Sequence, residues 1–205
     1  MLIHTNVRST RRKAQKVSGS ALNNVDSLSP GDVMTTMIDS ILKREGGFVD
    51  HPNDRGGPTN FGITQRSLAR WRGADVSRDD VHRMTQDEAR AIYRSTYFTQ
   101  PKIDQLPALV QAIVFDMAIN HGPATAIRLL QEVVNAAGFP CAQDGAIGNK
   151  TITAVSNACA AIGKLLINKL VDQRVKLYES IVAGDASQAV FLKGWLRRAD
   201  AFRQA

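Results

Sequence analysis

Residues 43–64, KREGGFVDHPNDRGGPTNFGIT, contain five glycines and two prolines. Glycine and proline interrupt helices and long strands, so this segment can form only short strands joined by turns. It therefore predicts a small, irregular β-hairpin lobe.

The sequence on both sides of this lobe has the periodicity of helices. Upstream, apolar residues recur at helical spacing, at Met34, Met37, Ile38, Ile41 and Leu42. Gly46 and Gly47 then end the helix, because glycine adopts the left-handed cap conformation without steric cost. Downstream, Thr64 is expected to cap a short helix that ends at Gly73, and TQDE at residues 85–88 has the pattern of a capping box.

Later segments predict further helices. Residues 106–120 are apolar nearly all round, which is typical of a central, buried helix, and residues 124–137 predict a second helix. One long or two shorter helices follow to Val182, and FLKGWLRRADAF closes the chain. The fold is therefore expected to be mainly α, with a C-terminal helical subdomain.

The charge of the chain is unevenly distributed. Residues 1–30 carry five basic side chains against one acidic side chain, and so contribute +4 of the formal net charge of +7. Nucleic acid, an anionic membrane or an acidic polymer would suit such a charge, but a basic, flexible, solvated tail is the favoured interpretation. This tail has no apolar core of the kind that a secretory signal needs.

Among the chemical motifs, only the carboxylates of the lobe stand out. The sequence has no nucleophile elbow, no phosphate-binding glycine loop and no HExxH, so neither a metal nor a cofactor is expected. Cys141 and Cys159 have no His or Cys at ligand spacing, and we expect two unpaired thiols unless the compartment is oxidising.

Glu45 is the strongest candidate for a catalytic group. It lies on the last turn of its predicted helix, where the negative end of the dipole disfavours a carboxylate, so the position suggests a function. A glycosidase needs a protonated carboxylic acid and a second group across the sugar. The lobe supplies Asp50 and Asp54 as carboxylates and Thr59 and Asn60 as polar groups, although such turn residues often only cap and bend the chain.

The lobe resembles a known family signature. The run EGGFVDHPNDRGGPTNFGIT is similar to that of the glycoside hydrolase family 108 N-acetylmuramidases, a lysozyme-like group that includes phage endolysins and secretion-activator proteins. The resemblance implies a lysozyme-like helical fold in which Glu45 is the catalytic acid. Phe48 and Phe61 stand where tyrosine is commoner, which removes a hydroxyl but keeps an aromatic wall.

A looser resemblance to phage-type lysozymes implies two further catalytic residues. The resemblance lies in the order of Glu45, Asp54, Thr59 and the pair Gly62-Ile63 along the chain. By this analogy Asp54 assists and Thr59 helps to hold the attacking water opposite Glu45. A structural cap is the alternative for Asp54. Because few carboxylates are available to act as a nucleophile, we expect hydrolysis to invert the configuration at the anomeric carbon.

Five residues are predicted to contact the substrate. They are Asp50, Asn60, Phe61, Tyr97 and Asn120. Three of them have a structural alternative. Asp50 can bond its own turn, Tyr97 can be a core residue because it follows Tyr93 at helical spacing, and Asn120 with Asp116 can instead cap backbone amides of the lobe. Asn120 is assigned to the sugar cleft, whereas Asp116, one turn before it, is assigned a structural role.

The resemblance continues beyond the lobe, over residues 34–202. FDMAINHGPATAIRLLQ and SQAVFLKGWLRRADAF are similar to later segments of the family, and DGAIGNKTITAV is similar to a turn of small peptidoglycan-binding modules. This implies a tail at residues 1–30, a muramidase domain at residues 31–123, and a peptidoglycan-binding-like subdomain at residues 124–205 that is packed on it.

The function implied is hydrolysis of the β-1,4 bond between N-acetylmuramic acid and N-acetylglucosamine. The expected partner of this bacteriolytic monomer is the peptidoglycan glycan strand, with no nucleic acid. The protein would be made in the cytoplasm and act in the periplasm or cell wall, with a holin or a secretion system for export. A non-catalytic cell-wall-binding accessory of a secretion apparatus is the alternative.

Overall fold

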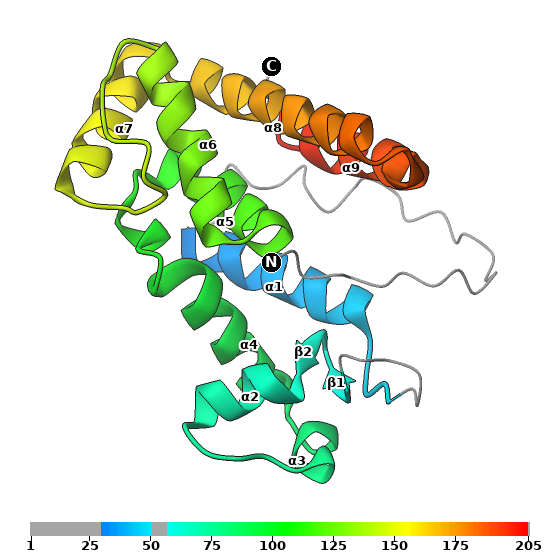
Figure 1. Ribbon diagram of the computed structural model, residues 1–205. Coiled ribbons are helices and arrows are strands. Elements are labelled where there is room, and N and C mark those ends of the chain that lie inside the picture. The colour runs from blue at the N-terminus through cyan, green and yellow to red at the C-terminus, as the bar shows by residue number, and fades with distance from the viewer. Residues whose placement is uncertain (1–29, 51–56, 205) are drawn as a thin grey trace. The chain divides into compact units, whose positions relative to one another are not determined.

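The computed structural model describes residues 30–50 and 57–204 (Figure 1). Within these residues the chain divides into two compact units, and the boundary between the units falls between Thr96 and Tyr97. Helices dominate both units, and the described residues contain a single sheet of two short strands. The predicted mainly α fold with a small β-hairpin lobe is therefore confirmed. Nearly all of the predicted tail lies outside the described residues.

The first unit places a β-hairpin between a long helix and three shorter ones. In chain order its elements are α1 (Pro30–Glu45), β1 (Thr59–Asn60), β2 (Ile63–Thr64), α2 (Gln65–Arg72), α3 (Arg78–His82) and α4 (Gln86–Arg94). The predicted apolar stripe of α1 is buried at Met34, Ile38, Ile41 and Leu42. It packs against α4, whose Ile92 is also buried.

The hairpin forms in the glycine-rich segment, as predicted. Strand β1 pairs antiparallel with β2, with Thr59 opposite Thr64 and Asn60 opposite Ile63. On its other edge, Thr59 exchanges two backbone hydrogen bonds of 2.8 Å with Val49. The segment that follows α1 is thereby fixed to the hairpin.

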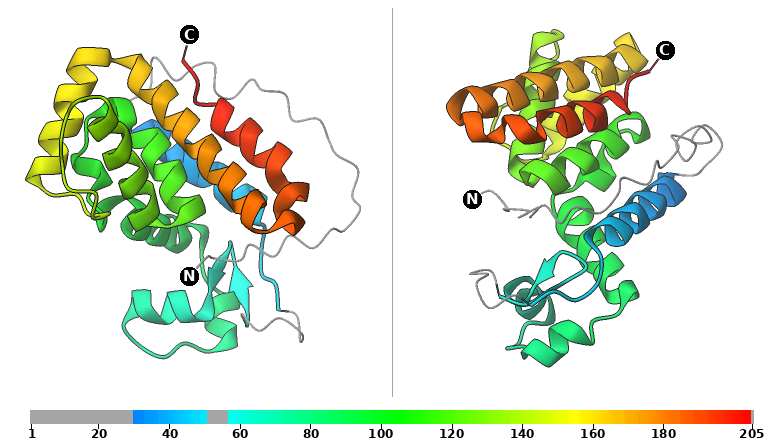
Figure 2. Two further views of the ribbon diagram at one scale, coloured as in Figure 1. Left: turned by 45° about the horizontal axis from the view of Figure 1, so that its top comes forward. Right: turned by 90° about the vertical axis from the view of Figure 1, so that its right-hand side faces the viewer.

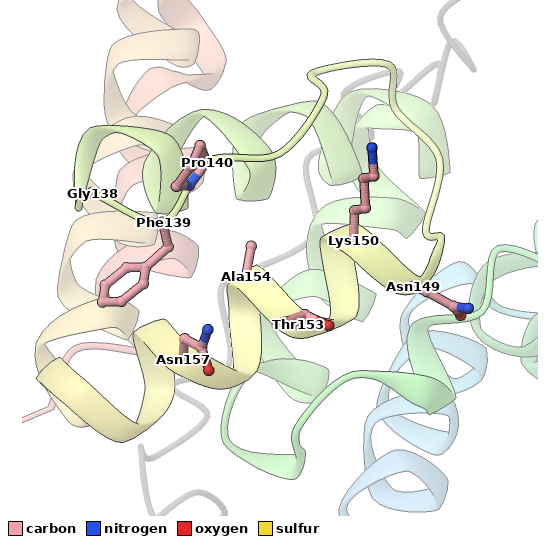
Figure 3. Close-up of a pocket in the computed structure, with 8 residues that line it drawn as sticks. All are labelled: Gly138, Phe139, Pro140, Asn149, Lys150, Thr153, Ala154 and Asn157. Atoms are coloured by element: carbon pink, nitrogen blue, oxygen red, sulfur yellow. The ribbon is translucent and has the colours of Figure 1, made fainter.

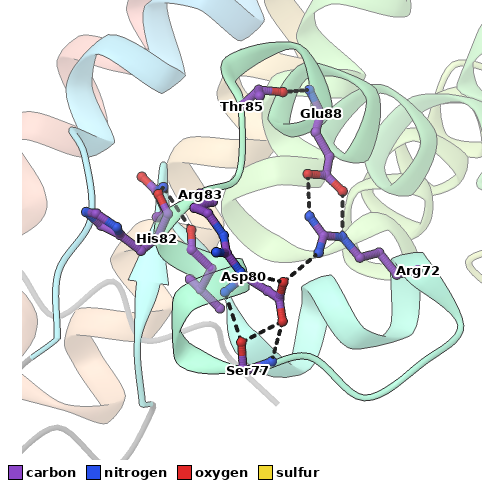
Figure 4. Close-up of polar contacts among 9 residues, drawn as sticks. Arg72, Ser77, Asp80, His82, Arg83, Thr85 and Glu88 are labelled. Atoms are coloured by element: carbon purple, nitrogen blue, oxygen red, sulfur yellow. Dashed lines mark hydrogen bonds and ion pairs between the residues drawn. The ribbon is translucent and has the colours of Figure 1, made fainter.

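The predicted caps of α2 form, and the predicted capping box of α4 forms in part. Thr64 caps α2, and Gly73 ends it with a φ of +68°. At α4 the Thr85 hydroxyl accepts from the Glu88 amide, but both carboxylate oxygens of Glu88 accept hydrogen bonds from Arg72, at 2.9 and 2.8 Å (Figure 4). A complete capping box occurs instead at α3, between Ser77 and Asp80, which the sequence analysis did not identify.

The second unit is a helical bundle (Figure 2). A π-helical turn, η2 (Ser95–Thr99), leads into it. Its further elements are η3 (Ile103–Gln105), α5 (Ala108–His121), α6 (Pro123–Ala136), α7 (Asn149–Ile162), α8 (Lys164–Gly184), η4 (Ala186–Gln188) and α9 (Ala189–Asp200). Helix α5 is central and buried, as predicted, and it packs against α6 and α8. Helices α8 and α9 lie side by side in both views of Figure 2.

The segment predicted as one long or two shorter helices is two helices. Gly163, with a φ of +48°, separates α7 from α8, and the pair is bent by 115°. None of the described helices is alone long and apolar enough to cross a membrane, and only this bent pair reaches that length and composition together. Cys141 and Cys159 are both free thiols in this structure.

A buried ionic cluster joins three helices of the bundle. Asp116 of α5 accepts from Arg174 of α8 at 2.6 Å and from Arg198 of α9 at 2.8 Å. Burial pushes the pKa of Asp116 upward, but the two guanidinium groups outweigh this effect and hold the pKa below its usual range. Asp116 therefore has the structural role assigned to it from the sequence.

The two units do not follow the domain boundary expected from the sequence. The division falls between Thr96 and Tyr97, so that α5 belongs to the same compact unit as α6–α9. The proposed domains at residues 31–123 and 124–205 stay a prediction.

Candidate active site

Glu45 is the last residue of α1, as predicted. Gly46 has a φ of +77°, and its amide donates to the Leu42 carbonyl at 3.1 Å. This left-handed residue closes the final helical turn and directs the chain away from the axis. The Glu45 side chain is partly exposed at that end.

The turn of the hairpin has an unusual backbone. Its two residues, Phe61 and Gly62, have φ values of +51° and +76°. Two-residue hairpin turns of this kind match the twist of the strands, but a non-glycine residue with positive φ costs on the order of 1–3 kcal/mol. The Tyr93 hydroxyl donates to the Phe61 carbonyl at 3.0 Å and so helps to hold the turn.

This turn lies directly against Glu45. A Cβ atom at Gly62 would lie 3.1 Å from Glu45 Cγ and 2.8 Å from the Tyr93 hydroxyl oxygen. Only glycine fits a backbone that is left-handed and this close to two side chains. The end of α1, the hairpin turn and α4 thus converge on Glu45, and they form the candidate site.

Two of the predicted substrate-contacting residues have structural partners in the lobe. Asp50 pairs with Arg78, whose guanidinium lies 5.1 Å from the ring centre of Phe48. Asn60 is 4% exposed, and its side-chain amide donates to the carbonyls of Val81 and His82, at 2.9 and 3.2 Å. Both side chains join the segments around the hairpin to α3. Their contact with substrate stays a prediction, and so does the alternative that Asp50 bonds its own turn.

The other predicted residues fall in three places. Thr59 is half-buried on β1 and Phe61 is half-buried in the turn, so both belong to the lobe that carries the Glu45 contact. Asp54 lies outside the described residues. Tyr97 and Asn120 belong to the second unit, where burial raises the pKa of the Tyr97 hydroxyl and the Asn120 side chain donates to the Asp116 carbonyl at 2.5 Å.

The roles of Tyr93 and Gly62 were not predicted from the sequence. Tyr93 is buried on α4. A buried tyrosine hydroxyl needs a hydrogen-bond partner, and this requirement was the available signal. Which carbonyl would supply the bond could not be read from spacing. Within the described residues, no group of three or more His, Cys, Asp or Glu side chains is arranged to hold a metal.

Comparisons with known proteins agree with the family resemblance. Residues 38–122 match the family model described as Glycosyl hydrolase 108, and residues 125–200 match one described as Predicted Peptidoglycan domain. The solved structure of Brucella abortus SagA is similar, with a TM-score of 0.65 and 38% identity over 85% of this chain and 93% of that one. No curated protein matches the sequence. With a relative this similar over nearly its whole length, the chain belongs to the glycosyl hydrolase 108 family and is a glycoside hydrolase followed by a predicted peptidoglycan domain.

Proposed function

We propose that this protein is an N-acetylmuramidase that hydrolyses the β-1,4 bond between N-acetylmuramic acid and N-acetylglucosamine in peptidoglycan. Two findings support the proposal: membership of a glycoside hydrolase family, and a predicted peptidoglycan domain in the same chain. The observation that carries the residue assignment is the close approach of Gly62 to both Glu45 and Tyr93. A strained, glycine-dependent turn against one carboxylate is typical of a functional site.

In the proposed mechanism Glu45 is the general acid. It protonates the glycosidic oxygen as the bond to the anomeric carbon breaks, and water attacks that carbon from the opposite face. By analogy with phage-type lysozymes, Asp54 and Thr59 position this water, and the anomeric configuration is inverted. Proton NMR of the first product anomer during hydrolysis tests the stereochemistry, and net retention would contradict this part of the proposal.

Replacing Glu45 by glutamine tests the acid. The amide keeps the size of the side chain but cannot donate the proton, so we expect clearing of peptidoglycan in a zymogram to fall by about 10²-fold or more. Glu179→Gln, at an exposed glutamate of α8, is the matched control and should clear as the unmodified protein does. Circular dichroism checks that both variants fold.

The alternative function is a cell-wall-binding accessory without turnover. It predicts that the unmodified protein binds peptidoglycan but releases no new reducing ends. Full clearing by the Glu45→Gln variant would instead show that the enzyme is active with a different general acid. That result would contradict the assignment of Glu45.

The setting of the reaction is part of the proposal. A muramidase of this kind works at the cell wall, as a monomer, and the protein would reach the wall through a holin or a secretion apparatus. Dependence of lysis on a co-expressed holin would favour a phage lysis role. Wall editing during secretion would need the secretion apparatus instead.

A further inference from the structure

A groove on the second unit contains none of the residues assigned to the candidate active site. It lies between α7 and the segment that follows α6, and it has a volume of about 480 Å³ (Figure 3). Its lining residues are Gly138, Phe139, Pro140, Asn149, Lys150, Thr153, Ala154 and Asn157. This volume is within the range of small-ligand pockets.

The wall of the groove is held in place by α6. Asn135 clamps the Cys141 backbone, accepting from its amide at 2.7 Å and donating to its carbonyl at 3.0 Å. Cys141 directly follows Phe139 and Pro140, so the two hydrogen bonds to Asn135 also restrain the backbone of these two groove residues.

The far end of the same loop is also held. Gln131 is fully buried and bonds to Asp144, Gly145, Ala146 and Thr151. A Cβ at Gly145 would lie 2.8 Å from the Ala124 carbonyl oxygen, so the loop packs closely against α6. The DGAIGNKT turn therefore has a structural role, and the groove is preformed, which reduces the ordering cost of binding.

The chemistry of the lining suits a sugar. The Phe139 ring and the Asn157 amide lie at one end of the groove, and Asn149 and Lys150 lie at the other (Figure 3). Sugar rings pack their C–H faces on aromatic rings and present hydroxyl and acetamido groups at their edges. The exposed side chains of Asn149, Thr153 and Asn157 supply neutral donors and acceptors for such groups.

Lys150 is the single ionisable residue of the lining. One exposed cation beside three neutral polar side chains favours an uncharged saccharide over a polyanion. If the saccharide carries a stem peptide, its carboxylate can pair with Lys150.

We infer that this groove binds a β-1,4-linked N-acetylhexosamine backbone. The choice of this saccharide rests on the proposed function. Chitin and peptidoglycan share this backbone, and they differ in the stem peptide.

The experiment is a titration of full-length, ¹⁵N-labelled protein, followed by NMR. It uses the Glu45→Gln variant, which prevents turnover, and two probes: tetra-N-acetylchitotetraose and soluble, uncross-linked peptidoglycan strands. We expect both probes to shift the amide signals of residues 138–140 and 149–157. Because signals are followed residue by residue, binding in the groove is separated from binding at residues 45–64.

Three variants test the assigned contacts. Phe139→Ala should weaken binding in the groove by about tenfold, and Asn157→Ala, at an exposed helix position, by about fivefold. Phe191→Ala, which removes another partly exposed phenylalanine on α9, is the matched control and should leave binding unchanged. Lys150→Ala should weaken binding of the peptidoglycan strands but not of chitotetraose.

Two outcomes would overturn the inference. One is that shifts are confined to residues outside the groove, or are unchanged in both Phe139→Ala and the folded Asn157→Ala variant. The other is that a free stem peptide shifts the groove signals while chitotetraose does not. Neither outcome depends on hydrolysis, so failure of the groove leaves the zymogram result for Glu45 standing, and the reverse also holds.

Discussion

At the scale of single residues, the candidate site depends on Gly62. Its positive φ and its closeness to Glu45 and Tyr93 are two independent reasons for glycine. Phe61 beside it carries backbone strain, which the hydrogen bond from the Tyr93 hydroxyl offsets. The hairpin turn therefore limits where the Glu45 side chain can lie, and the hydrogen bond from Tyr93 of α4 stabilises that turn.

We predict that Gly62→Ala reduces peptidoglycan hydrolysis by more than its effect on stability explains. The new Cβ would lie 2.8 Å from the Tyr93 hydroxyl oxygen and 3.1 Å from Glu45 Cγ, so the turn or these side chains must shift and the setting of Glu45 changes. Backbone strain adds about 1–2 kcal/mol. Initial rates on peptidoglycan and urea denaturation measure the two effects.

Gly73→Ala is the control for this prediction. Gly73 has a similar φ of +68°, but a Cβ there would have no atom within 4 Å, so it introduces strain without the clash. Equal losses of activity in the two variants would contradict a special role for Gly62. Partial recovery in a Gly62→Ala, Tyr93→Phe double variant would support the clash as the cause.

At the scale of elements, His121 joins the end of α5 to α8. The centres of the His121 and Tyr178 rings are 5.3 Å apart, and the Arg174 guanidinium lies over the Tyr178 ring, 5.6 Å from its centre. Burial lowers the pKa of His121 to about 4, and the positive charges of Arg174 and Arg198 add to this against the opposing effect of Asp116. His121 is therefore neutral in the folded protein at neutral pH.

We predict that mild acid destabilises this bundle. Between pH 6.5 and about 4 the unfolded chain binds a proton at His121 that the folded chain does not. The free energy of unfolding therefore decreases as the pH is lowered through this range. One such group accounts for a loss of about 2 kcal/mol between pH 7 and 5. Chemical denaturation at both pH values measures it.

Removing the histidine identifies the source of the loss. His121→Gln should flatten the dependence of unfolding free energy on pH over this window. His82→Gln, at an exposed histidine of α3, should leave it as it is. An unchanged slope in His121→Gln would exclude His121 as the titrating group.

Elements also differ in how well the sequence predicted them. Helix α1 and the cap of α2 were predicted correctly because their signals lie within a few residues of each other. The capping box at α4 was predicted in full but formed in part, because Glu88 pairs with Arg72, 16 residues earlier. A local pattern does not show that a distant arginine competes for the same carboxylate.

At the scale of the whole molecule, charge is the property that bears on the substrate. The net charge of +7 favours approach to an anionic cell wall through long-range attraction. Such attraction weakens when the Debye length shortens from about 10 Å at 0.1 M salt to about 3 Å at 1 M.

We predict that binding to insoluble peptidoglycan weakens as salt is raised, whereas binding to uncharged chitin changes little. Sedimentation of the Glu45→Gln variant with each polymer, over roughly 0.05 to 0.5 M salt, measures the two dependences within the range where screening changes most. Equal salt dependence on both polymers would show that wall charge is not the cause.

The sequence alone determined the features that arise from neighbouring residues. These are the apolar stripe of α1, the end of that helix at Glu45 and the hairpin in the glycine-rich segment, because periodicity and glycine act over a few residues. Tertiary structure decided which faces meet: Gly62 against Glu45 and Tyr93, and Asp116 between Arg174 and Arg198, which lie 58 and 82 residues away. Spacing in the sequence identifies the face of an element, whereas the partner of that face is set by packing of the whole chain.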